Sequence, residues 1–178
     1  MAAITVTQIH ALLTEVGRRY PLPATLTLLG GCALCLLGST RPTLDIDYVG
    51  HDLHKNELQQ VIDLVAQEMQ MEVEAVPIDG FIPLPSDSLQ RQLPAGNFGS
   101  ISVYILDPYS IALSKIDRGL DSDLADVVFL IRQGFITLKQ LEVVVQSALP
   151  HAKEFSMNPT TMQEHIEDVK HQLSLLNL

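Results

Sequence analysis

Residues 28–50 read "LLGGCALCLLGSTRPTLDIDYVG", and this segment brings two glycines, two cysteines and two aspartates close together in the chain. Three interpretations compete for it. The cysteines form a redox or zinc CxxC motif, or the glycines form a phosphate-binding turn, or the whole segment is a packed strand, helix and strand. The correct choice decides the fold and the chemistry of the chain.

Composition limits the class of protein. A chain of 178 residues is long enough for one domain of ordinary size and short for two. Hydrophobic residues make up 47% and charged residues 18%, which is typical of a globular protein with a substantial core and excludes an intrinsically disordered one. The formal net charge of −10 opposes a long contact with nucleic acid or with an anionic membrane, although it permits a small pocket for one polyphosphate.

Membrane insertion and secretion are not expected. A transmembrane helix needs about 20 consecutive apolar residues, and the longest candidate, residues 26–37, is interrupted by Gly30 and Gly31. The N-terminal stretch "MAAITVTQIHALL" lacks the basic region and the small-residue cleavage site of a signal peptide. We therefore predict a cytoplasmic protein with no membrane partner. Two cysteines also provide no disulfide framework.

Hydrophobic periodicity predicts a single α+β domain over residues 1–178, with a mixed α/β core followed by C-terminal helices. The chain is expected to alternate helices and strands and then to become wholly helical. A long stretch rich in Pro, Gly, Ser and Asp, at 79–97, is predicted to be a loop. The expected strands are 25–29, 44–49, 71–78 and 100–106, and the expected helices are 4–20, 32–38, from Asp52 or His54 to 70, 108–118, 121–133, 137–149, and from 158–159 onward.

The two cysteines are predicted to be packing residues. A structural zinc site needs four ligands, and no second Cys/Cys or Cys/His pair accompanies Cys32 and Cys35. A redox pair usually lies at an exposed helix start, where the pKa of a thiol is lowered. Alanine and leucines surround both cysteines, and a free cysteine often behaves as a small hydrophobic side chain.

The aspartates are the stronger candidates for chemistry. Asp45 and Asp47 lie two apart on a predicted strand, so both carboxylates project from the same face. Adjacent like charges repel unless a cation or hydrogen-bond donors hold them. Hard oxygen ligands at this spacing suit Mg²⁺, which also binds substrate phosphates. The alternative is a solvated polar face on an edge strand, and an isolated DxD motif does not decide between the two.

Gly30 and Gly31 strengthen the metal hypothesis. A strand that ends in two glycines just before a helix lets the backbone approach a phosphate, with amide groups and the helix dipole directed at it. The alternative is a tight turn between strand and helix without a ligand. Arg41 and Thr43 follow in the connection to the DxD strand, where they contact phosphate or cap the turn.

The segment resembles the signature of nucleotidyltransferase-fold proteins, in which a strand, a glycine pair, a short helix and a DxD strand follow one another. Its compact form is similar to the nucleotidyltransferase-like toxins of bacterial type IV toxin–antitoxin systems and their relatives. A second stretch, "VYILDPYSIALSKIDRGLDSDLADVVFLI" at 103–131, resembles the downstream signature of the same proteins. The matching positions are Gly30, Gly31, Ala33, Leu34, Arg41, Thr43, Asp45, Ile46 and Asp47, then Lys115, Arg118, Asp123 and Asp126.

The resemblance covers a core at about residues 25–132 and implies a small mixed β-sheet flanked by helices, with a C-terminal helical cluster at about 133–178. It also implies Mg²⁺-dependent transfer of a nucleoside monophosphate from an NTP to an acceptor hydroxyl on RNA, protein or a small molecule. Asp45 and Asp47 would hold one or two Mg²⁺ ions. The nucleotide would be bound by Gly30, Gly31, Arg41, Thr43, Lys115 and Arg118. A role as the toxin half of a pair would add an antitoxin-like partner, and the alternative function is a non-catalytic nucleotide-binding or protein-interaction module.

Such sites usually contain a third carboxylate on a neighbouring strand, as a metal ligand or as a base for the acceptor hydroxyl. The predicted strand at 71–78 and the residue after it offer Glu72, Glu74 and Asp79, of which we choose Glu74. The alternative is that both glutamates are merely solvated.

Three other aspartates have structural interpretations. Asp107 precedes Pro108, a pairing typical of a helix N-cap. Asp123 and Asp126 are spaced to form ion pairs with Lys115 and Arg118 instead of binding a metal.

Overall fold

The computed structural model describes residues 3–176, which divide into two compact units. The sheet unit comprises Met1–Ile78 and Gln92–Leu106, and the helical unit comprises Asp79–Arg91 and Asp107–Leu178. The α+β class is confirmed, whereas folding of the whole chain as one domain stays a prediction.

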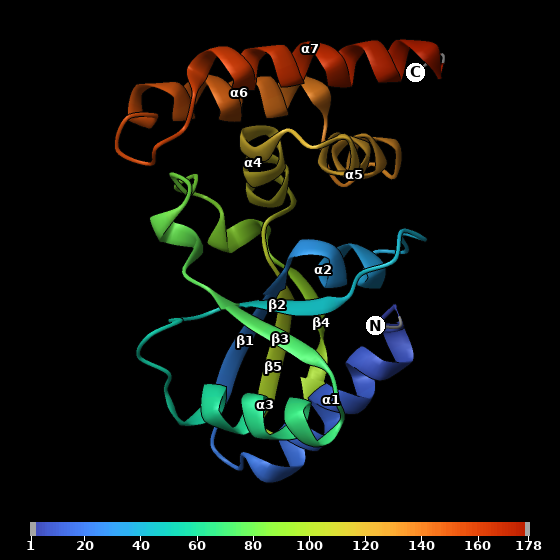
Figure 1. Ribbon diagram of the computed structural model, residues 1–178, viewed down its shortest axis with the longest axis vertical. Helices are drawn as coiled ribbons and strands as arrows, with labels where there is room; N and C mark the ends of the chain where they lie inside the picture. The colour runs from blue at the N-terminus through green and yellow to red at the C-terminus, as the bar shows by residue number, and fades with distance from the viewer. Residues whose placement is uncertain (1–2, 177–178) are drawn as a thin grey trace. The chain divides into compact units, whose positions relative to one another are not determined.

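The sheet unit is built on a five-stranded mixed sheet with the order β3-β2-β1-β5-β4 (Figure 1). β1 is parallel to β5 and β2 is parallel to β3, whereas the β1–β2 and β4–β5 pairs are antiparallel. This is the small mixed sheet with flanking helices that the resemblance implies. Its elements are α1 (Val6–Arg19), β1 (Ala24–Leu29), α2 (Gly30–Leu36), β2 (Asp45–Val49), α3 (Glu57–Glu68), β3 (Glu72–Val76), β4 (Leu93–Phe98) and β5 (Ile101–Ile105).

The two faces of the sheet differ in chemistry because side chains alternate along each strand. On one face the central strands present buried apolar residues, and buried apolar residues of α1 and α3 add to this core. The strand residues of this face include Leu26, Leu28, Ile46, Tyr48, Val103 and Ile105. The alternate positions of β2 and β3 are acidic, so the opposite face presents carboxylates.

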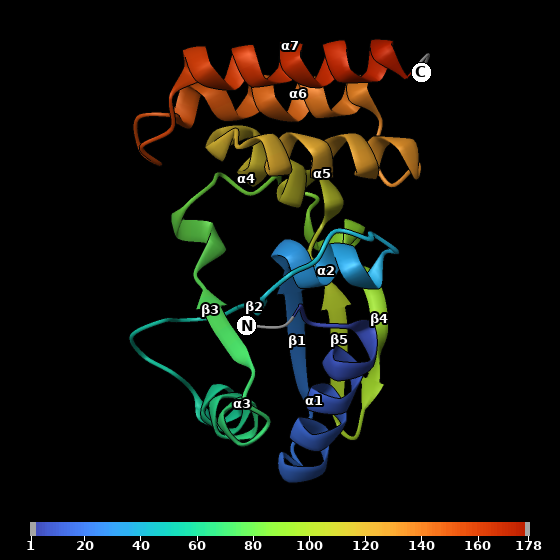
Figure 2. The same ribbon diagram turned by 45° about the vertical axis from the view of Figure 1, so that its right-hand side comes forward.

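The helical unit is organised around α4 (Pro108–Arg118), which contacts three other helices: α5 (Asp121–Arg132), α6 (Leu138–Ala148) and α7 (Pro159–Leu175). Figures 1 and 2 both show α7 lying alongside α6. Residues 3–176 also contain three short 3₁₀ segments, which are η1 (Ile78–Gly80), η2 (Leu89–Arg91) and η3 (Leu149–His151). Among the described residues, no helix is both long and apolar enough to cross a membrane.

Most predicted elements are confirmed with small shifts at their ends, and three differences are informative. Most of β4 was predicted to be loop, because proline and glycine, here Pro94 and Gly96, are uncommon inside strands. The pairing of β4 with β5 is irregular between these two residues. α2 begins at Gly30 and so contains the glycine pair. α3 begins only at Glu57, because Asn56 caps it in a reciprocal capping box.

The substitution Gly17→Ala tests how closely α1 packs on β4 in the sheet unit. A Cβ atom at this position of α1 would lie 2.2 Å from the backbone oxygen of Phe98 and 2.5 Å from its carbonyl carbon, so Gly17→Ala forces backbone apart. Overpacking of this kind costs about 1–3 kcal/mol. We expect the cost to exceed the gain of roughly 1 kcal/mol in helix propensity. Urea denaturation measures the free energy of unfolding.

Gly80→Ala is the control, because a Cβ at Gly80 would meet nothing within 4 Å. Its effect should stay within about 0.5 kcal/mol. A Gly17→Ala protein as stable as the Gly80→Ala protein would contradict the proposed close packing of α1 on β4.

Candidate functional site

The acidic face of the sheet unit places carboxylates side by side through strand register. Asp45 and Asp47 lie on β2 with their side chains on the same face. The parallel partner of Asp47 on β3 is Glu74, and that of Asp45 is Glu72. Directly paired residues of adjacent strands project to the same side, so β3 brings glutamate side chains to the aspartates.

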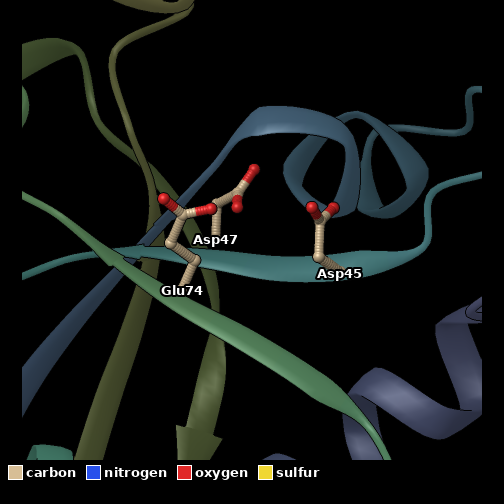
Figure 3. A group of neighbouring side chains, drawn as sticks. All are labelled: Asp45, Asp47 and Glu74. Carbon is tan, nitrogen blue, oxygen red and sulfur yellow. The ribbon is translucent and has the colours of Figure 1, made fainter.

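Three of these carboxylates form a cluster. One oxygen from each of Asp45, Asp47 and Glu74 lies within 4.8 Å of the others. Figure 3 shows the two aspartates rising from β2 and the glutamate from β3, all on one side of the sheet. The aspartates are half-buried and Glu74 is exposed. Like charges at this distance repel unless a cation binds between them, and carboxylate oxygens are the ligands that Mg²⁺ prefers.

Of the three candidates for the third carboxylate, the structure brings Glu74 to the aspartates. Glu72 lies on the same face but outside the cluster, and Asp79 belongs to η1. The geometry therefore agrees with the choice of Glu74, whose chemical role stays a prediction.

The two glycines allow the start of α2 to lie against the carboxylate cluster. Gly30 has a φ of +65°, and a Cβ atom there would lie 1.9 Å from Oδ2 of Asp47. A Cβ atom on Gly31 would lie 2.4 Å from the hydroxyl oxygen of Thr43. Any larger residue at either position would displace the side chain opposite it. Leu29, the N-cap residue of α2, makes no side-chain cap hydrogen bond to the helix.

Thr43 and Arg41 lie in the connection between α2 and β2. The Thr43 hydroxyl is 3.1 Å from Oδ1 of Asp45, so the structure places this side chain against an aspartate. Arg41 is half-buried, and its carbonyl oxygen accepts a hydrogen bond from the Cys35 thiol at 3.5 Å. Phosphate contacts by Gly30, Gly31, Arg41 and Thr43 stay predictions.

The cysteines pack as predicted. Both are buried, and neither forms a disulfide. The Cys32 thiol donates a hydrogen bond to the carbonyl oxygen of Leu29 at 3.1 Å. Burial raises the pKa of the Cys32 thiol, and the negative charge of Asp47 raises it further. Cys32 is therefore an unreactive neutral thiol at physiological pH, because only the thiolate is nucleophilic.

In the helical unit, Lys115 forms buried ion pairs. Its ammonium nitrogen lies 3.0 Å from Oδ1 of Asp123 and 2.6 Å from Oδ2 of Asp126, and only 2% of the Lys115 side chain is exposed. Arg118 also pairs with Asp123, at 2.7 Å. The ion-pair interpretation of these aspartates is thus confirmed. The nucleotide contacts that the resemblance implies for Lys115 and Arg118 stay predictions.

Asp107 caps α4, as the Asp-Pro pair predicts, and has a partner that the sequence does not reveal. The fully buried carboxylate accepts hydrogen bonds from the backbone N–H groups of Tyr109 and Ser110. It also accepts two hydrogen bonds from the Arg91 guanidinium, at 2.8 and 2.7 Å. Arg91 lies within the predicted loop and carries no local signal of this pairing.

Comparison with known proteins agrees with this geometry. Residues 5–171 match the family described as "Nucleotidyltransferase of unknown function (DUF6036)". The chain belongs to this family. DUF6036 membership confirms the nucleotidyltransferase resemblance, and the similarity to toxins stays a prediction. Searches of curated proteins and of solved structures found no match.

The substitution Gly30→Ala in this DUF6036 protein tests the contact between α2 and the carboxylate cluster. The new Cβ would lie 1.9 Å from Oδ2 of Asp47, so we expect the carboxylate to move and Mn²⁺ affinity to fall. Electron paramagnetic resonance of free and bound Mn²⁺ measures this affinity. We expect it to fall about 10-fold or more, as when a contact that orients a metal ligand is lost.

Gly38→Ala is the matched control, because Gly38 also has a positive φ, of +96°, but a Cβ there would meet nothing within 4 Å. The control introduces backbone strain without a clash. Equal Mn²⁺ affinity in the two variants would contradict the role assigned to Gly30.

Lys115→Met tests the buried ion pairs of the helical unit. It leaves two buried aspartates without their shared cation, and breaking a buried pair in this way costs about 3–5 kcal/mol. Lys170→Met is the control, since Lys170 is 35% exposed and pairs with Glu142 and Glu167 at the surface. A surface pair contributes about 0–1 kcal/mol, and chemical denaturation separates the two expectations.

The pH dependence of stability gives a second measurement on the Lys115→Met protein. Burial raises the pKa of Asp123, but Lys115 and Arg118 outweigh it and hold that pKa below its ordinary value of 3.8. The stability that this lowered pKa contributes is present above pH 3.8 and is lost as pH falls through the lowered pKa. Without Lys115, only Arg118 opposes the effect of burial on Asp123, so we expect the pKa of Asp123 to rise and acidification to destabilise the variant less than the wild type. If the free energy of unfolding changed with pH in the same way in the wild type and in the Lys115→Met protein, the ion-pair assignment would be contradicted.

Proposed function

We propose that this protein is a metal-dependent nucleotidyltransferase that transfers a nucleoside monophosphate from an NTP to an acceptor hydroxyl. The observation that carries the proposal is the cluster of Asp45, Asp47 and Glu74, whose carboxylate oxygens lie within 4.8 Å of one another. Membership of a nucleotidyltransferase family supports the same reaction class. Neither aspartate is fully buried, which leaves the cluster within reach of a ligand.

The cluster fits a divalent metal ion by its donor set. All three side chains offer carboxylate oxygens, and the glycine at position 30 leaves room for Oδ2 of Asp47, where a Cβ would collide with it. Asp45 and Asp47 would hold Mg²⁺, with Glu74 as a third ligand or as a base. When bound, Mg²⁺ would neutralise charge on the phosphates of the nucleotide.

The reaction assigns separate roles to the protein groups. The acceptor hydroxyl oxygen forms a bond to the α-phosphorus of the NTP while the bond between the α-phosphorus and its bridging oxygen breaks, and pyrophosphate leaves. In its role as a base, Glu74 would take the proton of the attacking hydroxyl. The amides of Gly30 and Gly31, at the start of α2, and the Arg41 guanidinium bind the phosphates and orient the nucleotide.

The acceptor belongs to one of three classes, which are RNA, protein or a small hydroxylated molecule. The net charge of −10 disfavours RNA bound without a helper, because phosphate contacts need basic side chains. The toxin role, the antitoxin-like partner and the cytoplasmic location rest on the sequence alone.

Substitutions in the carboxylate cluster test the proposal. We expect Asp45→Asn and Asp47→Asn to abolish transfer of label from α-³²P NTPs to acceptor pools in the presence of Mg²⁺. Glu74→Gln should lower the rate about 10²–10⁴-fold, the usual contribution of a general base. Glu72→Gln is the matched control, because Glu72 is the neighbouring glutamate on the same face of β3 but lies outside the cluster.

The outcomes separate the candidate functions. Equal losses in Glu74→Gln and Glu72→Gln would overturn the role of Glu74. Mg²⁺-dependent nucleotide binding without transfer to any acceptor pool would favour the non-catalytic binding module. Absence of any Mg²⁺-dependent nucleotide binding would overturn the site assignment altogether.

A further inference from the structure

The Thr43 side chain is buried against one aspartate of the carboxylate cluster. Only 6% of Thr43 is exposed, and its hydroxyl lies 3.1 Å from Oδ1 and 3.3 Å from the backbone oxygen of Asp45. The hydroxyl has one proton and donates to one acceptor at a time. An ionised carboxylate is the stronger acceptor, because hydrogen bonds to charged groups are shorter and stronger than those to neutral ones.

Thr43 is held in place on several sides. The backbone N–H of Ile4 donates to the Thr43 carbonyl oxygen at 2.8 Å, in an isolated antiparallel bridge that ties the start of the chain to this residue. On the side-chain face, Gly31 approaches so closely that a Cβ there would lie 2.4 Å from the hydroxyl oxygen and 2.8 Å from Cβ of Thr43. A β-branched side chain in such a position has little rotational freedom.

The hydroxyl itself is not needed for packing. Valine has nearly the same shape as threonine and would fill the same space without burying a polar group. A buried hydroxyl costs free energy unless it is hydrogen-bonded, so this hydroxyl offsets its cost only through its contact with Asp45. The contact with Oδ1 therefore satisfies the buried hydroxyl and at the same time restrains the Asp45 carboxylate.

We propose that Thr43 is a positioning residue that orients the Asp45 carboxylate toward the divalent metal ion. The inference rests on the proposed function, because it assigns the metal to Asp45. Donation to Oδ1 restricts rotation of the carboxylate group and leaves its other lone pairs to the ion. Side chains that orient metal ligands in this way typically contribute 10- to 100-fold to metal affinity.

The experiment measures binding of Mn²⁺ alone, without nucleotide, by electron paramagnetic resonance of the free and bound ion. Thr43→Val removes the hydroxyl and keeps the shape, and we expect Mn²⁺ affinity to fall about 10- to 100-fold. Thr43→Ser keeps the hydroxyl and should restore the affinity to within a few-fold of the wild type. Thermal unfolding of each variant checks folding, and Thr43→Ala provides a second hydroxyl deletion if the valine protein does not fold.

A double-mutant cycle tests whether Thr43 acts through Asp45. In an Asp45→Asn background, Thr43→Val should produce little further loss of Mn²⁺ affinity, because the two residues act as a unit. Additive losses would overturn the inference, and so would a Thr43→Val protein with wild-type affinity, or equal losses for valine and serine. A wild-type protein that binds Mn²⁺ no more tightly than Asp45→Asn would instead overturn the proposed metal site itself, which distinguishes the two failures.

Discussion

The carboxylate cluster depends on the absence of a side chain at position 30. β1 and β2 are antiparallel, with Leu29 directly opposite Asp47, so the chain must leave the strand and begin α2 immediately beside the Asp47 carboxylate. Only a residue without a Cβ fits there, and the left-handed φ of Gly30 turns the chain into the helix at the same point. The same turn buries the Cys32 thiol between the carbonyl oxygens of Leu29 and Asp47, which links the helix to both strands.

Two groups of aspartates in this chain illustrate how surroundings decide what a carboxylate does. Asp123 and Asp126 are each 2% exposed and share the Lys115 ammonium group, so their charges are compensated within the helical unit. Asp45 and Asp47 are half-buried on a sheet face that adds Glu74 to their negative charge. The first group stabilises helix packing, whereas the second concentrates negative charge where a cation can reach it.

The sequence predicts features whose signals are local. Alternation along residues 44–49 placed Asp45 and Asp47 on one face, and the glycine pair marked the end of β1. The Asp107–Pro108 pair correctly indicated the start of α4. Glu74 was chosen from the order of elements alone, whereas the cluster that includes Glu74 and leaves out Glu72 is visible only in the structure.

Features that depend on contacts between distant segments were out of reach. The position of Thr43 follows from the approach of Gly31 and from a bridge to Ile4, neither of which leaves a local pattern. The pairing of Arg91 with Asp107 joins a segment that reads as a loop to a helix cap. β4 was missed because proline and glycine interrupt its alternation, although pairing with β5 provides its hydrogen bonds.

The position of β3 at the edge of the sheet affects how the carboxylate cluster can open locally. β2 is hydrogen-bonded to a neighbour on each side, whereas β3 is paired with β2 alone. Local opening of an edge strand needs fewer broken hydrogen bonds than opening of an inner strand. Fraying of β3 would therefore withdraw Glu74 while the pairing of Leu29 with Asp47 still joins β2 to β1. The cluster thus loses its third carboxylate by a local motion that leaves the β1–β2 pair intact.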